Sequence, residues 1–379
     1  MSNESKAVQA KMSQPVTAVT PVNDPSEDFQ TLLKDMANLK EESRLEKSKN
    51  TDVDLSSMGQ NEAEVSLISP VMNMKCRKVM KGHRGRILHF DWSPDLRKVV
   101  TAGQDGNAVI WDGLSGQKEI IIQTQASWVL SCCYSPSTTL VACGGLDNRC
   151  SVYKVDERFS GEGQVARITM PRMSLQEHSK YVTQVAFFGS DQQLLTSSAD
   201  TTCALWDMEQ KEPVRSFQGH KLEVLGLALN PRDPYTVFAS GSCDRTARVW
   251  DARSGVCVMR FEGHEGDINA VRFFPSGDAL GTACNDGTIH LFDLRADQQI
   301  KMFTKPSILF GSSALDFSKS GRILFAGYDD YTVRAWDVLK GDHLTLWHHH
   351  QDRVSHISVS PDGTALGSAS WDGTFRISA

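Results

Sequence analysis

The sequence lacks any apolar run that approaches the roughly 20 residues needed for a membrane-spanning helix. Its first residues have no charged-then-apolar secretory pattern and no glycine at position 2, and its last residues have no prenylation cysteine. We therefore expect a cytoplasmic chain with no direct membrane span, so any membrane attachment must come through a partner.

Clustered positive charge and paired cysteines are also missing. The formal net charge is −6, and no stripe of lysine and arginine is present to neutralise a phosphate backbone, so we expect no nucleic-acid ligand. The nine cysteines are an odd number without Cys-x-x-Cys spacing, and most lie among apolar residues. This pattern indicates reduced, buried thiols in a cytosolic protein.

Motifs of catalysis are absent as well. The chain contains no Gly-x-Ser-x-Gly elbow, no phosphate-binding Gly-rich Lys-Ser/Thr loop and no His-Glu-x-x-His pair. One cluster, His348 to His350 with Asp352 and His356, suggests a metal. Adjacent strand residues point to opposite faces, however, so three consecutive histidines cannot converge on one ion. We expect no enzyme, no cofactor and no metal site.

The first 73 residues divide into three segments. Residues 1–25 are polar and are expected to be disordered, and residues 50–73 have the composition of a linker. Between them, residues 26–49 are expected to form a short coiled-coil helix, with a 3, 4, 3 apolar seam of Phe29, Leu32, Met36 and Leu39. A lone helix of this length is marginal in water, so it needs a partner helix. Alternatively, the seam packs on the rest of the chain.

Residues 74–379 repeat with a period of 42 to 44 residues, apart from one interval of 53. Each unit has an aspartate six residues before a strand-ending position, and five units begin with a histidine 22 or 24 residues before that aspartate. The strand-ending positions are Trp111, Tyr153, Trp206, Trp250, Phe292, Trp336 and Ser378; the aspartates are Asp105, Asp147, Asp200, Asp244, Asp286, Asp330 and Asp372; the histidines are His83, His178, His220, His264 and His350. This spacing is typical of WD-repeat propeller blades, each of four strands.

A hydrogen-bond network explains the residue types of the repeat. The five units with a histidine carry a hydroxyl four residues before the aspartate, whereas units two and six have Cys143 and Ala326 there. Buried polar groups must be paired, so we expect the histidine, hydroxyl, aspartate and tryptophan to bond one another and to be structural. The hydroxyl residues are Thr101, Thr196, Ser240, Thr282 and Ser368.

The ends of the repeat region predict how the ring closes. The last unit stops at Ala379 without a fourth strand, and Lys75 to Met80 can supply it. We therefore expect an all-β, seven-bladed propeller over residues 74–379. The 53-residue interval contains an insert near residues 159–172, which we interpret as a solvated surface loop, although a role in partner choice is also possible.

Several segments are more specific than the general repeat. Residues from about 75 to the end resemble heterotrimeric G-protein beta subunits, with the coiled-coil helix in the matching place before them. The resemblance is carried by residues 141–153 (VACGGLDNRCSVY), 203–207 (CALWD), 263–269 (GHEGDIN), 291–297 (LFDLRAD) and 321–330 (GRILFAGYDD). The long N-terminus and Leu88 are more similar to the divergent subclass that pairs with regulators of G-protein signalling.

The resemblance implies a non-catalytic signalling subunit acting downstream of G-protein-coupled receptors at the cytoplasmic face of the plasma membrane. Its helix would pair with a gamma subunit or with the gamma-like domain of a regulator of G-protein signalling. Its narrow face would bind the GDP-bound alpha subunit and, once released, effectors. Carried over by position, that face includes Arg86, Lys118, Trp128, Leu146, Asn148, Tyr181, Asp267 and Trp371.

Some residues depart from the family pattern, and other interpretations stay open. Arg84, Leu88, Asn107 and Asn285 stand where most members have leucine, tyrosine, lysine and aspartate. Trp128 and Trp371 could pack between blades instead of binding a partner. An unrelated WD-repeat scaffold or adaptor would need neither the helical seam nor these specific segments. An enzyme in the central channel would need convergent titratable groups, but the aspartates we can place belong to blade turns.

Overall fold

The computed structural model describes residue 34 and residues 74–155 and 165–379. The expected disordered segment 1–25, coiled-coil helix 26–49 and linker 50–73 lie outside the described residues, apart from the helical Lys34. Within the described ranges, no helix has the length and apolar character needed to span a bilayer.

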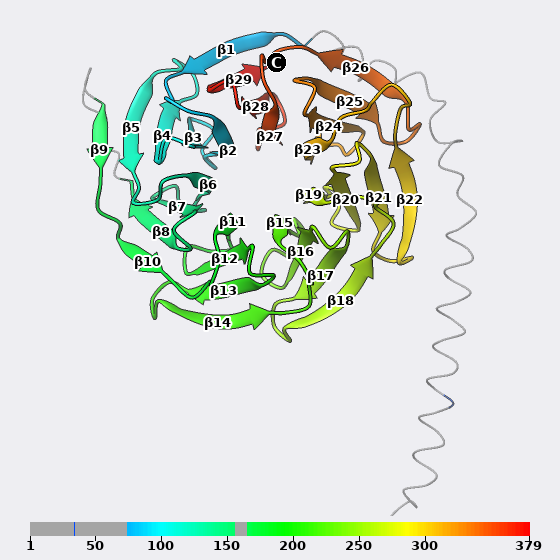
Figure 1. Ribbon diagram of the computed structural model, residues 1–379, viewed down its shortest axis with the longest axis horizontal. Coiled ribbons are helices and arrows are strands. Elements are labelled where there is room, and N and C mark those ends of the chain that lie inside the picture. The colour runs from blue at the N-terminus through cyan, green and yellow to red at the C-terminus, as the bar shows by residue number, and fades with distance from the viewer. Residues whose placement is uncertain (1–33, 35–73, 156–164) are drawn as a thin grey trace, which may run out of the picture. The chain divides into compact units, whose positions relative to one another are not determined.

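Seven sheets, antiparallel apart from one short parallel strand in blade one, stand around a central axis in chain order (Figure 1). The strands of the first three blades are given from the one nearest the axis to the outermost. Blade one contains β2 (Ile87–Trp92), β3 (Lys98–Gly103), β4 (Asn107–Asp112), β5 (Lys118–Gln123) and β9 (Ala166–Ile168); blade two contains β6 (Val129–Tyr134), β7 (Leu140–Gly145), β8 (Cys150–Lys154) and β10 (Met173–Leu175); blade three contains β11 (Val182–Phe187), β12 (Gln193–Ser198), β13 (Cys203–Asp207) and β14 (Glu212–Phe217).

The remaining four sheets follow the same plan, and the last takes its outer strand from the start of the domain. Blade four contains β15 (Val224–Leu229), β16 (Val237–Ser242), β17 (Ala247–Asp251) and β18 (Val256–Phe261); blade five contains β19 (Ile268–Phe273), β20 (Ala279–Cys284), β21 (Ile289–Asp293) and β22 (Gln298–Phe303); blade six contains β23 (Ser312–Phe317), β24 (Ile323–Tyr328), β25 (Val333–Asp337) and β26 (His343–Trp347); blade seven contains β27 (Val354–Val359), β28 (Leu366–Ser370), β29 (Thr374–Ser378) and β1 (Cys76–Lys81).

The core lies between neighbouring blades. The second strands β7, β20 and β24 are buried along their whole length, because a blade packs on each of their faces. Outer strands such as β18 alternate exposed and covered residues, as expected for a sheet with one solvated face. Apolar clusters therefore combine residues of adjacent blades, as Phe90 of blade one does with Phe375 of blade seven.

Polar side chains near the axis connect one blade to the next. Asp91 in β2 accepts a hydrogen bond from the Tyr134 backbone nitrogen at 2.8 Å, and Asp316 in β23 accepts one from that of Val359 at 2.7 Å. Burial raises the pKa of Asp91 to about 6, even though the Tyr134 hydrogen bond favours the charged form. These contacts fix the spacing of the inner strands around the ring.

The predicted ring closure is confirmed. Strand β1 pairs antiparallel with β29, and Met80 lies opposite Phe375. Lys75 and Ala379 exchange two backbone hydrogen bonds of 3.2 and 3.1 Å. The strand at the start of the domain thus completes blade seven and pairs the edge of β29.

The predicted hydrogen-bond network is confirmed for the histidine blades one, three, four and seven. In blade four, His220 Nδ1 lies 3.0 Å from Asp244, His220 Nε2 lies 2.7 Å from the Ser240 hydroxyl, and Trp250 Nε1 donates to that hydroxyl at 2.8 Å. Blades one and three repeat this geometry, and blade seven repeats its histidine contacts without a tryptophan. The matching histidine–aspartate pairs are His83–Asp105, His178–Asp200 and His350–Asp372, at 3.0, 2.9 and 3.0 Å.

Blade five differs from the prediction. In blade five, His264 Nε2 bonds Thr282 at 2.6 Å, but its Nδ1 is 3.6 Å from Asp286, too far for a hydrogen bond. Blade six lacks the histidine of the repeat, and its Asp330 accepts hydrogen bonds from Arg334 and Thr332. The Arg334 side chain is buried, so its guanidinium replaces the missing imidazole.

The interpretation of the insert as a solvated loop is wrong for part of it. Ala166–Ile168 form β9, which pairs parallel with Ile120–Ile122 of β5 and gives blade one a fifth strand. The physical reason is that the outer edge of β5 presents unpaired backbone groups, which a short strand can satisfy. Residues 156–164 lie outside the described residues.

Candidate protein-docking surface

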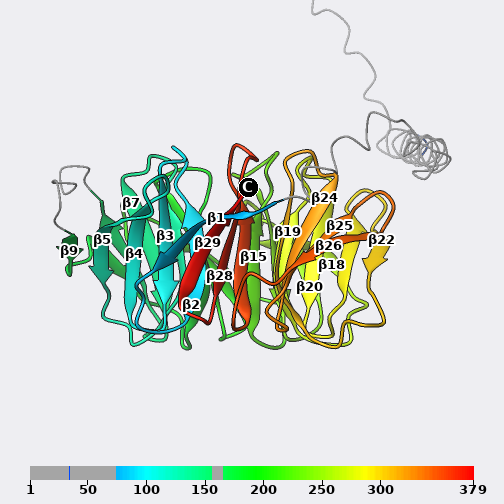
Figure 2. The same ribbon diagram turned by 90° about the horizontal axis from the view of Figure 1, so that it is seen from above.

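Seven of the eight surface residues predicted from the resemblance share one end of the propeller. They precede the first strand of a blade or lie in the turn between its second and third strands. Because strands alternate in direction within a blade, these two connections fall at the same end. Figure 2 shows the blades edge-on, with the connections gathered at the two ends. We call this end the loop-end face; Lys118, which begins β5, instead lies on the outer side of blade one.

Trp371 is held between two arginines at the junction of blades seven and one. The guanidinium carbon of Arg86 lies 4.2 Å from the centre of the indole ring, and that of Arg353 lies 4.8 Å from it. Asp329 of blade six accepts hydrogen bonds from two nitrogens of Arg353. Cation–π contact and a bidentate ion pair therefore fix the orientation of the indole before any partner arrives.

Trp128 and Leu146 form an exposed apolar pair on blade two. Their side chains are 39% and 37% exposed, and the Leu146 backbone nitrogen donates to the Trp128 carbonyl at 3.2 Å. The alternative that Trp128 packs between blades is therefore wrong. An aromatic residue presented to solvent on a rigid turn is the type of residue that dominates protein–protein binding energy.

Hydrogen bonds fix the remaining three residues of the face. The Tyr181 hydroxyl donates to Glu223 at 2.8 Å, and burial together with this bond raises the pKa of Tyr181 to about 12. Asn148 adopts a positive φ of 60° and donates to the Ser179 carbonyl at 3.1 Å, which links blades two and three. The backbone of Asp267 accepts a hydrogen bond from Asn285 at 2.9 Å.

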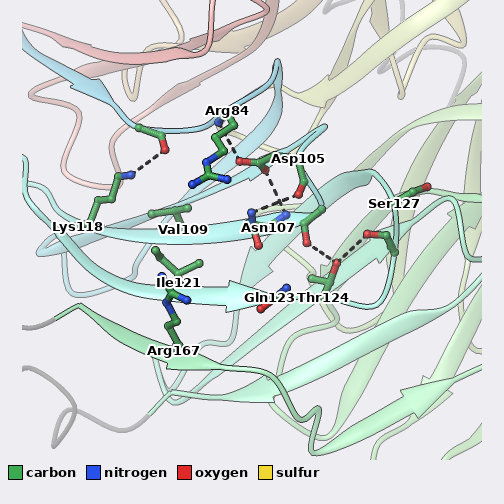
Figure 3. Close-up of a pocket in the computed structure, with 13 residues that line it drawn as sticks. Arg84, Asp105, Asn107, Val109, Lys118, Ile121, Gln123, Thr124, Ser127 and Arg167 are labelled. Carbon is green, nitrogen blue, oxygen red and sulfur yellow. Dashed lines mark hydrogen bonds between the residues drawn. The ribbon is translucent and has the colours of Figure 1, made fainter.

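A pocket of about 490 Å³ lies on the side of blade one. Figure 3 shows Arg84, Lys118 and Arg167 around it, from the loop before β2, from β5 and from β9. Asn107 also lines it, so two of the residues that depart from the family pattern, Arg84 and Asn107, meet Lys118 here. The Lys118 ammonium donates to the Gly82 carbonyl at 2.7 Å, whereas Arg84 and Arg167 are exposed. The pocket therefore offers basic groups to an anionic segment.

Sequence reasoning missed several residues of these surfaces. Leu222, Leu309, Phe310 and Tyr331 are exposed large side chains in loop-end connections. Arg353, Asp329 and Glu223 were also missed, although each orients a residue that was predicted. The only sequence signal for the four apolar residues is a leucine or aromatic residue in a turn. Single residues of this kind are common on ordinary protein surfaces, so the signal is weak.

The central channel contains a cavity of about 130 Å³ between the inner strands. His89 and His356 face each other there with ring centres 3.9 Å apart, and Arg272 donates to His356 Nε2 at 3.1 Å. Burial, reinforced by Arg272, lowers the pKa of His89 to about 3. The Ser313 and Ser355 hydroxyls that line the cavity donate to backbone carbonyls, so neither is activated by these histidines.

The suspected histidine cluster near residue 350 does not converge. His350 bonds Asp372 and Ser368, His356 faces the central cavity, and His349 lies 3.4 Å from the Ser378 hydroxyl. The reason differs from the prediction, because His349 and His350 lie in the connection between β26 and β27 and not in a strand, so strand alternation does not separate them.

Comparison with known proteins identifies relatives over most of the chain. A family model described as G protein beta WD-40 repeat protein matches residues 26–379. Guanine nucleotide-binding protein subunit beta-5b of Danio rerio is 46% identical over 304 residues, covering 80% of this chain and 76% of that protein. Guanine nucleotide-binding protein subunit beta-2 of Caenorhabditis elegans is 41% identical over 355 residues, covering 93% and 92%. Guanine nucleotide-binding protein subunit beta of Oryza sativa subsp. japonica is 34% identical over 345 residues, covering 86% and 88%.

Proposed function

The chain belongs to the G protein beta WD-40 repeat family, and on that premise we propose that it is a non-catalytic beta subunit that transmits signals by binding other proteins. Its loop-end face binds the GDP-bound alpha subunit and, after release, effectors. The observation that carries this proposal is the fixed Trp371 between Arg86 and Arg353, beside a face that also exposes Trp128 and Leu146.

The chemistry of the face supports binding more than catalysis. Trp, Tyr and Arg are the residue types whose truncation most often costs about 2 kcal/mol or more at interfaces. Four of the eight proposed contact residues are of these types: Arg86, Trp128, Tyr181 and Trp371. Because their neighbours already hold several of them, little side-chain entropy is lost when a partner docks.

A second partner is proposed for the segment before the propeller. The seam of Phe29, Leu32, Met36 and Leu39 fits a second helix from a gamma subunit or from the gamma-like domain of a regulator of G-protein signalling. Such a partner places the chain at the cytoplasmic face of the plasma membrane. The 46% identity to a beta-5b subunit favours the divergent subclass predicted from Leu88 and the long N-terminus.

Binding to immobilised alpha subunits, loaded with GDP or with a non-hydrolysable GTP analogue, tests this function. We expect the full chain and its co-purifying partner to bind the GDP form, and Trp371→Ala to weaken binding by about 2 kcal/mol, roughly 30-fold. Leu114→Ala is the matched control, because Leu114 is 78% exposed in a turn at the opposite end of blade one.

A WD-repeat scaffold of another complex is the alternative. It predicts no preference for the GDP form, and equal retention of alpha subunits by the Trp371→Ala and Leu114→Ala variants. That result would leave the fold intact and remove the G-protein function.

A further inference from the structure

Blade five brings three different donor groups together at the loop-end face. A ring nitrogen of His264, the Cys284 thiol sulfur and an oxygen of the Asp286 carboxylate lie within 4.8 Å of one another. His264 lies in the loop before β19, and the other two residues lie at the end of β20 and in the turn that follows. Imidazole, thiolate and carboxylate are the three side-chain types that bind zinc in proteins.

The contact between His264 and Asp286 is wider here than in the corresponding histidine blades. Their closest nitrogen and oxygen are 3.6 Å apart, whereas the equivalent pair in blade four is 3.0 Å apart and hydrogen-bonded. Zinc–ligand distances of about 2.0–2.1 Å in a tetrahedral site place two ligand atoms roughly 3.3 Å apart. The gap in blade five is therefore too long for a direct hydrogen bond and close to the span of two ligands on one ion. The Thr288 hydroxyl, 3.3 Å from His264 Nδ1 and 2.6 Å from Asp286 Oδ1, contacts both residues and would give up its contact with Nδ1 when an ion binds.

The third donor is specific to this blade. Blades three, four and seven have a serine where blade five has Cys284: Ser198, Ser242 and Ser370. Each of those hydroxyls accepts the backbone N–H of its turn aspartate at 3.1 Å. The Cys284 sulfur accepts the Asp286 N–H in the same way at 3.4 Å. Cysteine thus keeps the structural role of serine and adds a soft metal ligand.

A second imidazole lies against the cluster. The His290 ring stacks on that of His264, with centres 3.8 Å apart and an angle of 16° between the rings. His290 is only 3% exposed, and its Nδ1 has no hydrogen-bond partner among the residues that the structure describes. A buried imidazole nitrogen without a partner is costly, which a bound group would relieve. Blades four, six and seven have arginine at this position, as Arg248, Arg334 and Arg376.

We propose that blade five binds a divalent zinc-like cation through His264 Nδ1, Cys284 Sγ and the Asp286 carboxylate. The Asp286 side chain is 19% exposed and gives the ion a path from solvent. Water completes the four ligands, or His290 does after its ring turns. On binding, the Cys284 S–H bond breaks, a sulfur–metal bond forms and the proton passes to solvent, with no change of oxidation state.

Substitutions from the other blades provide variants that should fold. Cys284→Ser installs the residue of blades three, four and seven, and His290→Arg installs that of blades four, six and seven. Cys257→Ser is the control, because Cys257 is a partly covered thiol on β18 in blade four that does not belong to the cluster.

Cobalt titration of the full chain, purified with its partner and treated with chelator, tests the site. We expect one Co²⁺ per chain with a thiolate-to-cobalt charge-transfer band, displacement by Zn²⁺, and a Zn²⁺-dependent rise in Tm. Cys257→Ser keeps both signals, whereas Cys284→Ser loses the band and weakens binding by more than about tenfold, since even outer-shell changes weaken metal sites about 10–100-fold. His290→Arg removes the stacked imidazole and brings a cation beside the cluster, so we expect it to weaken metal binding as well.

Two results would overturn the proposal. One is a wild-type chain that shows neither a stoichiometric charge-transfer band with Co²⁺ nor a Zn²⁺-dependent rise in Tm. The other is a Cys284→Ser variant that keeps both, provided that its Tm in chelator equals that of the wild type.

Discussion

Ser240→Ala tests the hydrogen-bond network that we assign to each complete WD repeat. The Ser240 hydroxyl lies 2.7 Å from His220 Nε2 and 2.8 Å from Trp250 Nε1, and all three side chains are buried. Removing one oxygen therefore leaves two buried nitrogens without that partner. The neighbouring Ala239 and Ala247 show that small side chains are tolerated in these strands, so alanine itself should fit.

The magnitude follows from the two groups that lose a partner. A buried polar group without a hydrogen bond costs about 1–3 kcal/mol, so two of them cost roughly 2–6 kcal/mol. Because the contact between His220 and Asp244 at 3.0 Å stays in place, we expect a value in the lower half of that range. A loss of about 2–4 kcal/mol is a large part of the stability of a typical domain.

Urea unfolding of the full chain and its partner, followed by tryptophan fluorescence, measures the effect. Ser216→Ala is the matched control, since Ser216 is exposed on the outer strand β14, and we expect it to change the free energy of unfolding by less than about 0.5 kcal/mol. If both variants unfold at the same urea concentration, the network does not stabilise the blade and our reasoning fails.

Three further predictions concern ring closure, the docking face and pH. Met80→Ala shortens a side chain that is 1% exposed and should lower the free energy of unfolding in urea by about 2–5 kcal/mol. Val79 on the same strand is 44% exposed, so Val79→Ala should lower it far less. Equal effects of the two variants would refute closure through β1. Arg353→Ala should weaken binding of GDP-loaded alpha subunits by about 1 kcal/mol, roughly fivefold, by freeing Trp371, and unchanged affinity would contradict the clamp. Burial alone would raise the pKa of Asp244, but hydrogen bonds from His220, Thr246 and Lys221 hold that pKa below its usual value. The charged carboxylate therefore stabilises the fold fully at neutral pH, and this stabilisation is lost as the pH falls below about 5. Asp244→Asn should remove part of this acid sensitivity in urea unfolding, and an unchanged pH profile would contradict the assignment.

The repeat spacing was sufficient to predict the ring, because every blade packs in the same way and therefore places the same residue types at the same intervals. The positions of Asp244 and Trp250 define their strands, and the missing fourth strand after Ser378 points to the segment before His83. Such signals are local and recur along the chain, so a single sequence reveals them.

The features that sequence reasoning missed depend on contacts between distant residues or on small displacements. The Trp371 clamp needs Arg86 and Arg353 from either side of a blade junction. The wider gap between His264 and Asp286 is a difference of 0.6 Å from the 3.0 Å of blade four. Arg334 could have been found, because arginine four residues after the turn aspartate also occurs as Arg248 and Arg376.

The strand β9 was missed for a third reason. It is three residues long, and its sequence, Ala166 to Ile168, has no strand signal of its own. It is stabilised by the free edge of β5 in blade one, although in sequence it follows β8 of blade two. The repeat pattern describes the strands within a single unit, so it does not show that the edge of an earlier unit is free to pair with this segment.

The beta-subunit account is tested most directly by comparing the partners of the full chain with those of a chain carrying Leu32→Asp and Met36→Asp. Both baits are recovered from native lysate, and the retained proteins are identified by mass spectrometry. We predict that a small gamma subunit, or a regulator of G-protein signalling with a gamma-like domain, is retained by the unmodified chain and lost with the double variant. If neither partner is found and both baits retain the same proteins, the account is contradicted and a scaffold function replaces it.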